Sequence, residues 1–465
     1  MRYISTRGQA APRDFEAVLL AGLAEDGGLF VPETWPTLTP AEWRALRGLP
    51  YADLAARILS LFGAGGLPLE AMCRDAYAGF GHAAVVPLVQ LDHRTFALEL
   101  FHGPTLAFKD MALQLLGRMF DHVLEKRGER VTIVGATSGD TGSAAIEACR
   151  DRSAVDIVIL HPENRTSEVQ RRQMTTVLAP NVKNIAVQGD FDACQDLVKA
   201  MFNDAPFRAE MKLSAVNSIN WARIAAQIPY YVAAALALGA PDREVAVSVP
   251  TGNFGNVLAA WAARRMGLPI SHFVIGSNRN DILARFLASN DMSAKPVEPS
   301  LSPSMDIQVS SNFERLLFEL LGRDAAATAE AMTRFRAEGR MPVPDAAWKQ
   351  ATALFRGFTL DDAGTLAEIR HLWTSSGYLA DPHTAVGTAA ARALAPADPA
   401  VPAIVAATAH PAKFPDAVER ATGFRPPLPA RLADLYEREE RFSVLADDLG
   451  VIEAAVRAHA RRNAA

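Results

Sequence analysis

Cysteine is scarce in this sequence, and the few cysteines are far apart. The 465 residues contain 3 cysteines, Cys73, Cys149 and Cys194, with no C-x-x-C pair among them. Such spacing offers neither a disulfide framework nor a zinc-ligand set, and no H-E-x-x-H motif is present. We therefore expect a protein of the reducing cytoplasm without a metal centre.

Long apolar runs and blocks of one charge are lacking as well. The most apolar stretch, residues 224–240, is interrupted by Gln227 and Pro229 and is shorter than a membrane span, so it predicts a buried helix. The first residues lack the apolar core of a signal peptide. With 52 acidic against 47 basic residues and no basic block, the sequence predicts neither a membrane nor a nucleic acid as partner.

What the sequence does contain is an alternation of strand-like and helix-like segments. Hydrophobic residues make up 49% and charged residues 21%, as in ordinary globular proteins, and the length favours two or three domains. Runs rich in β-branched residues predict strands at 131–137, 155–160, 182–188, 245–250, 272–277 and 402–408. Helical patterns separate them, which predicts an α/β fold with open, mainly parallel sheets covered by helices.

Other segments have a mainly helical pattern. Residues 14–24 and 52–80 predict helices in an N-terminal unit of about 80 residues, with an extended segment after residue 27. Residues 191–202 place six residues on one helical face, which are Phe191, Cys194, Leu197, Val198, Met201 and Phe202. Residues 325–375 read as mostly helical, and the charged C-terminal stretch from residue 437 reads as one or two packing helices.

Two strand-to-helix junctions are rich in glycine. In the first, Gly139 and Gly142 lie among hydroxyl side chains; in the second, Gly252 and Gly255 open a helix. Glycine lets a backbone approach a ligand closely, and the free N–H groups at a helix start attract anions. Neither loop is a nucleotide-binding fingerprint. Simple helix capping is the alternative, but two such loops in one α/β chain favour anion binding.

One lysine, Lys109, stands at a predicted helix start in an otherwise apolar stretch that includes Phe101, Leu106 and Phe108. A lysine is a nucleophile only when neutral, so its pKa of ~10.4 must fall by roughly 3 units, which apolar walls and a nearby cation promote. The alternative is an ordinary lysine whose charge reaches solvent. A desolvated lysine, a phosphate-type loop and a hydroxyl-rich loop are together the parts that a pyridoxal phosphate enzyme needs.

These features and the stretches around them resemble the threonine synthase family. The matching stretches, from residue 3 to residue 414, are YISTRG, GLAEDGGLFVPE, ELFHGPTLAFKDMALQ, GATSGDTGSAA, VNSINWARI, VPTGNFGNV, SPSMDI, DPHTAVG and ATAHPAKF. The resemblance implies fold type II of pyridoxal phosphate enzymes, the tryptophan synthase β-like fold, with an N-terminal helical extension. It implies conversion of O-phospho-L-homoserine and water to L-threonine and phosphate by β,γ-elimination and replacement.

The resemblance also implies a domain division. It gives an N-terminal extension at 1–84, a large cofactor-binding α/β domain at 85–130 and 228–430, a smaller α/β domain with the substrate loop at 131–227, and a C-terminal helical segment at 431–465. We expect a monomer or a homodimer.

By the same resemblance, Lys109 carries pyridoxal 5′-phosphate as a Schiff base and is the catalytic residue. Thr408 forms a hydrogen bond with the pyridine nitrogen of the cofactor. The alternative is a threonine at a strand end whose hydroxyl only forms a hydrogen bond within a turn. The expected cradle of the cofactor phosphate is Gly252, Asn253, Phe254, Gly255 and Asn256. The expected substrate-binding residues are Thr137, Ser138, Asp140, Thr141, Asn217, Ser218, Asn220, Arg223 and Lys413.

Within this set, the loop 137–141 would meet the substrate carboxylate and the cofactor face, and Arg223 and Lys413 would bind the substrate phosphate. Surface cations are the alternative for both. Many related enzymes carry Asn where Asp140 stands, so the partner of this side chain stays open. His102, His383 and His410 lie in the matching stretches, where core or cap roles are commoner than catalysis.

Two rival functions remain open. A sister phospho-lyase of the same fold would give 2-oxobutyrate, ammonia and phosphate from the same loops. A non-catalytic sensor of a phosphorylated metabolite is the rival from another class, and the intact sequence around Lys109 argues against it.

Overall fold

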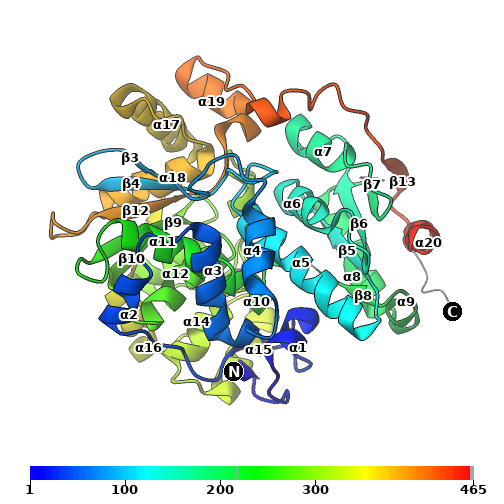
Figure 1. Cartoon of the computed structure of the whole chain (residues 1–465), viewed down its shortest axis with the longest axis horizontal. Coiled ribbons are helices and arrows are strands. Elements are labelled where there is room, and N and C mark those ends of the chain that lie inside the picture. The colour runs from blue at the N-terminus through cyan, green and yellow to red at the C-terminus, as the bar shows by residue number, and fades with distance from the viewer. Residues whose placement is uncertain (216, 461–465) are drawn as a thin grey trace. The chain divides into compact units, whose positions relative to one another are not determined.

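The structure, a computed structural model, describes residues 1–215 and 217–460. Val216 of the VNSINWARI stretch and residues 461–465 of the predicted C-terminal helix lie outside the described residues. The chain forms two compact units, each built around its own sheet (Figure 1). The first unit consists of Met1–Arg74, His82–His102 and Ser218–Pro426, and the second of Asp75–Gly81, Gly103–Asn217 and the residues from Pro427 onward.

The first unit contains a six-stranded sheet with the strand order β11-β10-β9-β12-β4-β3. All neighbouring strands are parallel except β3, which runs antiparallel to β4. The strands are β3 (Leu88–Gln90), β4 (Thr95–Glu99), β9 (Val245–Pro250), β10 (Ile270–Ser277), β11 (Phe355–Thr359) and β12 (Ala403–Ala407). Every residue of β9 and β12 is buried, as expected for central strands covered on both faces.

Helices cover this sheet on its two faces. α18 (Pro382–Ala393) packs on β9, β10 and β12, and α12 (Gly255–Arg265) packs on β9 and β10 from the other side (Figure 1). The other helices of this part are α10 (Trp221–Ala225), α11 (Ile228–Ala237), α13 (Ile282–Ser289), α14 (Phe313–Leu320), α15 (Ala325–Glu338), α16 (Asp345–Leu354), α17 (Asp362–Ser376) and α19 (Pro415–Thr422). The predicted buried helix within residues 224–240 is α11, flanked by α10.

The strand order reverses between β9 and β12. After β9 the chain adds β10 and β11 on one side, and it returns to form β12 on the opposite side of β9. Ligands of open α/β sheets bind beyond the carboxyl ends of the strands at such a reversal. The Gly252–Asn256 loop follows β9 and Thr408 follows β12, so both lie at this position.

The second unit contains a five-stranded, wholly parallel sheet with the order β13-β7-β6-β5-β8. Its strands are β5 (Val131–Ala136), β6 (Val155–Pro162), β7 (Val182–Gln188), β8 (Leu213–Ser214) and β13 (Ser443–Ala446). Its helices are α5 (Lys109–Arg127), α6 (Asp140–Cys149), α7 (Glu168–Thr175), α8 (Phe191–Asn203), α9 (Ala205–Met211) and α20 (Leu449–His459). The order again reverses at β5, the strand that leads into the hydroxyl-rich loop.

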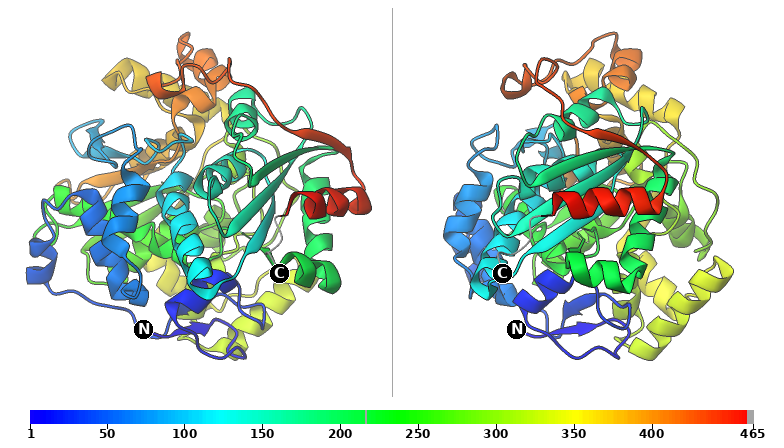
Figure 2. Two further views of the ribbon diagram at one scale, coloured as in Figure 1. Left: turned by 45° about the vertical axis from the view of Figure 1, so that its right-hand side comes forward. Right: turned by 90° about the vertical axis from the view of Figure 1, so that its right-hand side faces the viewer.

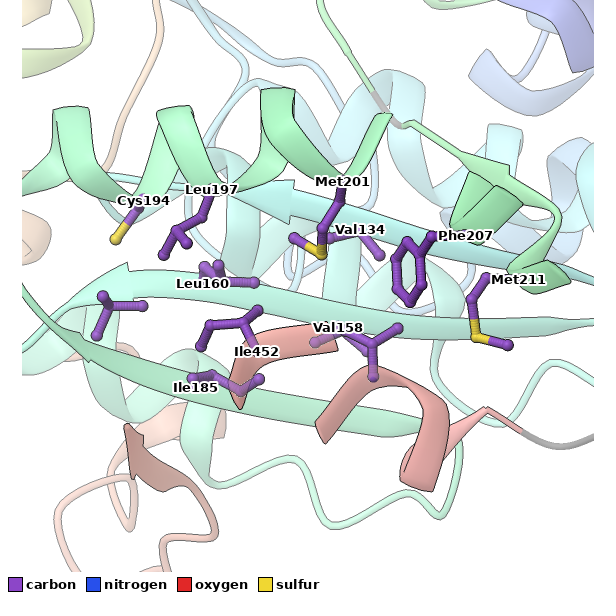
Figure 3. Packing of buried hydrophobic residues seen from close by; sticks show 12 residues of the cluster. Val134, Val158, Leu160, Ile185, Cys194, Leu197, Met201, Phe207, Met211 and Ile452 are labelled. Atoms are coloured by element: carbon purple, nitrogen blue, oxygen red, sulfur yellow. The ribbon is translucent and has the colours of Figure 1, made fainter. Parts of the chain in front are cut away.

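A hydrophobic cluster joins one face of this sheet to α8, α9 and α20. Figure 3 shows Val158 and Ile185 of the strands facing Leu197 and Met201 of α8, with Ile452 of α20 beside them. Figure 2 shows α20, in red, lying along the strands of this sheet. On the predicted apolar face of the 191–202 helix, Cys194, Leu197 and Met201 are buried, and the other three residues are partly buried.

Two segments predicted as helical are strands. Phe355–Thr359 forms β11, which pairs with β10, and Ser443–Ala446 forms β13, which pairs with β7. Both are edge strands, and most of their residues are only partly buried or exposed. Their local patterns carry little strand signal, and the pairing with a distant neighbour decides their conformation.

The N-terminal segment forms a small strand pair and helices. β1 (Tyr3–Ser5) pairs antiparallel with β2 (Phe30–Pro32). The helices are α1 (Phe15–Ala21), α2 (Pro40–Ala45), α3 (Tyr51–Leu59) and α4 (Leu69–Tyr77). Glu314 of α14 fastens this segment, since its carboxylate accepts hydrogen bonds from Thr6 Oγ1 at 2.6 Å and Arg7 Nε at 3.0 Å.

The described helices bear on whether the chain can span a membrane, and the cysteines on whether it can form disulfides. No helix within residues 1–215 and 217–460 is both long and apolar enough to cross a membrane. The three cysteines are free and buried. Burial raises the pKa of the Cys73, Cys149 and Cys194 thiols to about 12.

Candidate active site

Lys109 is the first residue of α5, and a buried carboxylate fixes the turn that leads to it. Asp110 is wholly buried; it accepts hydrogen bonds from Thr105 N at 2.8 Å and from Thr105 Oγ1 at 2.7 Å. Leu106 within this turn has a φ of 63°, which is unusual for a residue other than glycine. The packed turn therefore determines where the lysine side chain begins.

The Lys109 amine lies close to a carboxylate. The residue is 8% exposed, and its Nζ is 3.4 Å from Asp140 Oδ2 and 5.8 Å from the centre of the Phe108 ring. Gln170 Nε2 donates to Asp140 Oδ1 at 2.9 Å and so orients this carboxylate. The Lys109 amine thus faces an aromatic ring and an anion, and a nearby anion favours the ammonium form of an amine.

The hydroxyl-rich loop between β5 and α6 is shaped by Thr137. Its Oγ1 accepts hydrogen bonds from the backbone N–H groups of Gly139 and Gly142, both at 2.9 Å. Gly139 has a φ of 139°, and a Cβ on it would lie 2.4 Å from Gln170 Cδ. Ser138 is exposed at the tip, and Thr141 is half-buried. The Thr137 side chain thus forms the loop, while Ser138 is accessible to a ligand.

This role of Thr137 gives a prediction for stability. Thr137→Val keeps the shape of the side chain but leaves two buried N–H groups without their acceptor. We expect a loss of about 2–6 kcal/mol in the free energy of unfolding, since each of the two unsatisfied buried donors costs about 1–3 kcal/mol. Thermal unfolding would measure it. Thr132→Val, a buried threonine of β5 outside the loop, is the control, and equal melting temperatures of the Thr137 variant and the wild type would contradict this role.

The Gly252–Asn256 loop joins β9 to α12 in the first unit and is held in an unusual conformation. Phe254 has a φ of 63°, and its buried ring packs against those of Phe313 and Phe355 at 5.6 and 5.8 Å between centres. A Cβ on Gly252 would lie 3.2 Å from Met305 Cα, so only glycine fits without displacement. The N–H groups in the first turn of α12 lack intrahelical acceptors and are free to bind an anion.

Asn256 ends this loop with an amide that two tyrosines orient. Its Oδ1 accepts hydrogen bonds from Tyr230 OH at 2.8 Å and Tyr231 OH at 2.5 Å. Burial raises the pKa of both phenols, so they remain neutral donors. Asn256 Nδ2 and Thr251 Oγ1 are buried without a partner among the described residues. Fixed, unsatisfied donors at a helix start fit a phosphate such as that of pyridoxal phosphate.

Arg223 provides an isolated buried cation in the same unit. It lies in α10 and is 4% exposed, and its Nη1 has no partner within the part of the chain that the structure describes. Burial lowers its pKa to about 10, so it is still charged at neutral pH. A buried charge without a counter-ion is costly, which indicates that an anionic ligand completes this position.

The neighbours of Arg223 in the sequence have different roles. Asn220 caps α10 by accepting from Ala222 N at 2.9 Å, and it donates through Nδ2 to Leu19 O at 2.8 Å. Its amide therefore serves to place the helix that carries Arg223. Ser218 is half-buried, and its carbonyl accepts a hydrogen bond from Asn312 Nδ2 at 3.0 Å.

Thr408 directly follows β12 and is 5% exposed. Lys413 is wholly buried in the short 3-10 turn Pro411–Lys413.

His410 Nδ1 accepts from Ala412 N at 3.1 Å and caps this turn, and His383 Nδ1 lies 2.7 Å from the buried Asp381 carboxylate. Both histidines thus have the cap and core contacts expected for them.

Each unit therefore carries one group of the expected residues. The second unit has Lys109, the loop of Thr137, Ser138, Asp140 and Thr141, and Asn217. The first unit has Gly252–Asn256, Thr408, Lys413, Ser218, Asn220 and Arg223. Sequence reasoning missed the residues that hold these loops from behind, which are Tyr230, Tyr231, Ser310, Asn312 and Arg315. The two adjacent tyrosines in an apolar helix were the only local signal.

Three family descriptions match the chain. "Threonine synthase N terminus" matches residues 2–77, "Pyridoxal-phosphate dependent enzyme" matches residues 81–405, and "Threonine synthase, C-terminal" matches residues 384–456. The sequence is 56% identical over 466 residues to a threonine synthase of Pseudomonas aeruginosa, with 99% of each chain covered.

Solved structures agree with these sequence matches. A threonine synthase from Brucella melitensis, solved with pyridoxal phosphate bound, is 52% identical with a TM-score of 0.97, covering 99% of this chain and 100% of that one. Threonine synthase from yeast is 38% identical with a TM-score of 0.94, covering 98% of each chain. The similarity thus extends over essentially the whole chain.

Proposed function

Because the chain belongs to the threonine synthase family of pyridoxal phosphate-dependent enzymes, we propose that it converts O-phospho-L-homoserine and water to L-threonine and phosphate. The fold is that of fold type II enzymes of this cofactor, and the substrate is a small molecule. The single observation that supports a phosphorylated substrate best is Arg223, a buried guanidinium whose Nη1 has no partner among the described residues.

The described residues include each kind of group that pyridoxal phosphate needs. Gly252, Asn253, Phe254, Gly255 and Asn256 would hold its phosphate through N–H groups and the Asn256 amide. Lys109 would bind its aldehyde covalently, and Thr408 would bond the ring nitrogen. When bound, the cofactor withdraws electrons from the α-carbon of the substrate, which makes the C–H bond at that carbon acidic.

The chain's own groups would then handle protons and charge. The Lys109 amine, tethered at the start of α5, would remove and return protons at the carbons of the substrate. Asp140, held by Gln170, would orient that amine. Ser138 and Thr141 would bind the substrate carboxylate. Arg223 and Lys413 would neutralise the leaving phosphate, and fixed cations of this kind lower the barrier to its departure. The buried free cysteines agree with a cytoplasmic location.

A product assay tests the proposal. The purified protein with pyridoxal phosphate is incubated with O-phospho-L-homoserine, and threonine, 2-oxobutyrate and phosphate are followed together. We expect threonine and phosphate in equal amounts, with little 2-oxobutyrate. Unphosphorylated homoserine is the control substrate, and it should give no product, because a hydroxyl is a poorer leaving group than phosphate.

The assay also separates the rival functions. Formation of 2-oxobutyrate and ammonia in place of threonine would identify the sister phospho-lyase instead. Tight binding of the substrate without release of phosphate would identify a sensor, and either result would overturn the proposal.

A further inference from the structure

Asn312 touches two loops at once. Its backbone N–H donates to Asn253 O at 3.1 Å, and its side-chain Nδ2 donates to Ser218 O at 3.0 Å. Asn312 is wholly buried, and a Cβ on Gly255 would lie 3.2 Å from its Nδ2. One residue at the start of α14 therefore links the Gly252–Asn256 loop, through its backbone N–H, with the segment that enters α10, through its side chain.

Arg315, one helical turn further along α14, supports Asn312 from behind. Its Nη1 donates to Asn312 Oδ1, which fixes the amide so that Nδ2 faces Ser218. Its Nη2 donates to Ile219 O at 2.6 Å, and its Nε donates to Phe30 O of β2 at 2.9 Å. The guanidinium also lies 5.8 Å from the centre of the Trp221 ring. Arg315 thus joins the N-terminal strand pair to the segment before Arg223.

The chemistry of these contacts differs from that of an ordinary buried ion pair. The three acceptors around the Arg315 guanidinium are neutral oxygens, although it is only 1% exposed. Burial lowers its pKa to about 9, which still leaves it charged at neutral pH. Hydrogen bonds from a charged donor are about twice as strong as neutral ones, so the three oxygens are held firmly.

The adjacent residue provides a contrast. The Glu314 carboxylate accepts hydrogen bonds from Thr6 and Arg7, and within the described part of the chain it has no hydrogen bond to either loop, so its role is to hold the N-terminal segment in place. Ser310 Oγ donates to Gly252 O at 2.7 Å and supports the cofactor loop alone. Among these three, only Asn312 reaches both loops.

We propose that Asn312 and Arg315 are a positioning pair that couples the cofactor-phosphate loop, Gly252–Asn256, to the substrate-phosphate segment, Ser218–Arg223. The inference rests on the proposed function of these two loops. Neither residue touches the reacting atoms; the pair keeps Arg223 and the loop N–H groups in a fixed relation. Loss of the pair therefore weakens the binding of both phosphates.

The test compares variants on two separate readouts. The protein is stripped of pyridoxal phosphate and titrated with it, which gives a dissociation constant from absorbance without any turnover. The KM for O-phospho-L-homoserine is then measured at saturating cofactor. For Asn312→Ala we expect about a tenfold increase in the KM, because the hydrogen bond from Nδ2 to Ser218 O is lost, and a smaller, several-fold increase in the dissociation constant, because the backbone bond to Asn253 O remains and only the packing of the amide against Gly255 is removed.

Two matched variants separate positioning from stability. Ser310→Ala should raise the dissociation constant of the cofactor and leave the KM unchanged. Arg323 donates to Pro32 O and Glu33 O and so also fastens the segment after β2, but it contacts neither loop. Arg323→Met should lower the melting temperature and leave both binding constants unchanged. If Asn312→Ala does not fold, Arg315→Lys, which keeps the charge but loses the planar fork, replaces it with the same expected pattern.

Two results would overturn the inference. One is a folded Asn312→Ala or Arg315→Lys protein with both constants within twofold of the wild type. The other is an Arg323→Met protein in which both constants change as in the Asn312 variant. That result would show that a general loss of stability causes the change in binding. Neither result would be confused with failure of the proposed function, since that would appear as a wild type that binds the cofactor but forms no threonine.

Discussion

Replacing Lys109 by alanine should abolish the visible absorbance of the bound cofactor and lower turnover by at least about 10³-fold. The reason is that one amine both binds the cofactor covalently and moves the protons. The contact of 3.4 Å between Nζ and the Asp140 carboxylate would also be lost. Absorbance spectra and steady-state rates measure the two effects. Pyridoxal phosphate should still bind non-covalently, because its phosphate contacts lie in the Gly252–Asn256 loop.

Lys126 provides the matched control on the same helix. It lies in the last turn of α5 and is exposed, so Lys126→Ala should keep both absorbance and rate. Borohydride reduction of the wild type followed by peptide mapping should label residue 109. A label on any other lysine, or full activity of the Lys109 variant, would contradict the assignment.

Replacing Arg223 by methionine should change activity and stability in opposite directions. We expect kcat/KM for O-phospho-L-homoserine to fall by about 10²–10³-fold, the usual loss when a fixed group that stabilises developing charge is removed. The free energy of unfolding of the ligand-free protein should rise by about 1–3 kcal/mol, because an isolated buried charge is replaced by an apolar chain. Enzyme kinetics and thermal unfolding of the ligand-free protein measure the two effects.

Arg285 is the contrasting arginine in the same unit. Its guanidinium is paired with Asp281 and Asp291, so Arg285→Met should lower stability and leave KM unchanged. For Arg223→Met, inhibition by inorganic phosphate should weaken, whereas binding of unphosphorylated homoserine should not change. A weaker affinity for pyridoxal phosphate with an unchanged KM would instead place Arg223 at the cofactor phosphate and refute our assignment.

The fold class could be predicted from the sequence because the central strands are locally unambiguous. β5 and β9 are short runs rich in β-branched residues with a glycine-containing loop after them; β9 is wholly buried and β5 is buried at its centre, as in parallel sheets covered on both faces. β11 and β13 could not be predicted, since an edge strand has one neighbour and a partly exposed, mixed pattern. Their pairing with β10 and β7 depends on contacts between distant parts of the chain.

The same distinction applies to the candidate site. Lys109 and the two glycine loops could be picked out because each has a local signature at a strand-to-helix junction. Arg315 has none: it resembles any helical arginine, and its acceptor, Ile219 O, lies 96 positions earlier in the chain. The position of the Asp140 carboxylate beside the Lys109 amine could not be predicted either, since the sequence does not show which way the Asp140 side chain points.

The burial of Cys73, Cys149 and Cys194 has a practical consequence for spectroscopy. Thiol reagents attack the thiolate, and a thiol whose pKa is raised to about 12 yields almost none at neutral pH. A cysteine introduced at an exposed position would therefore react far ahead of the native ones. Fluorophores or spin labels can thus be attached at chosen surface positions without first replacing the natural thiols.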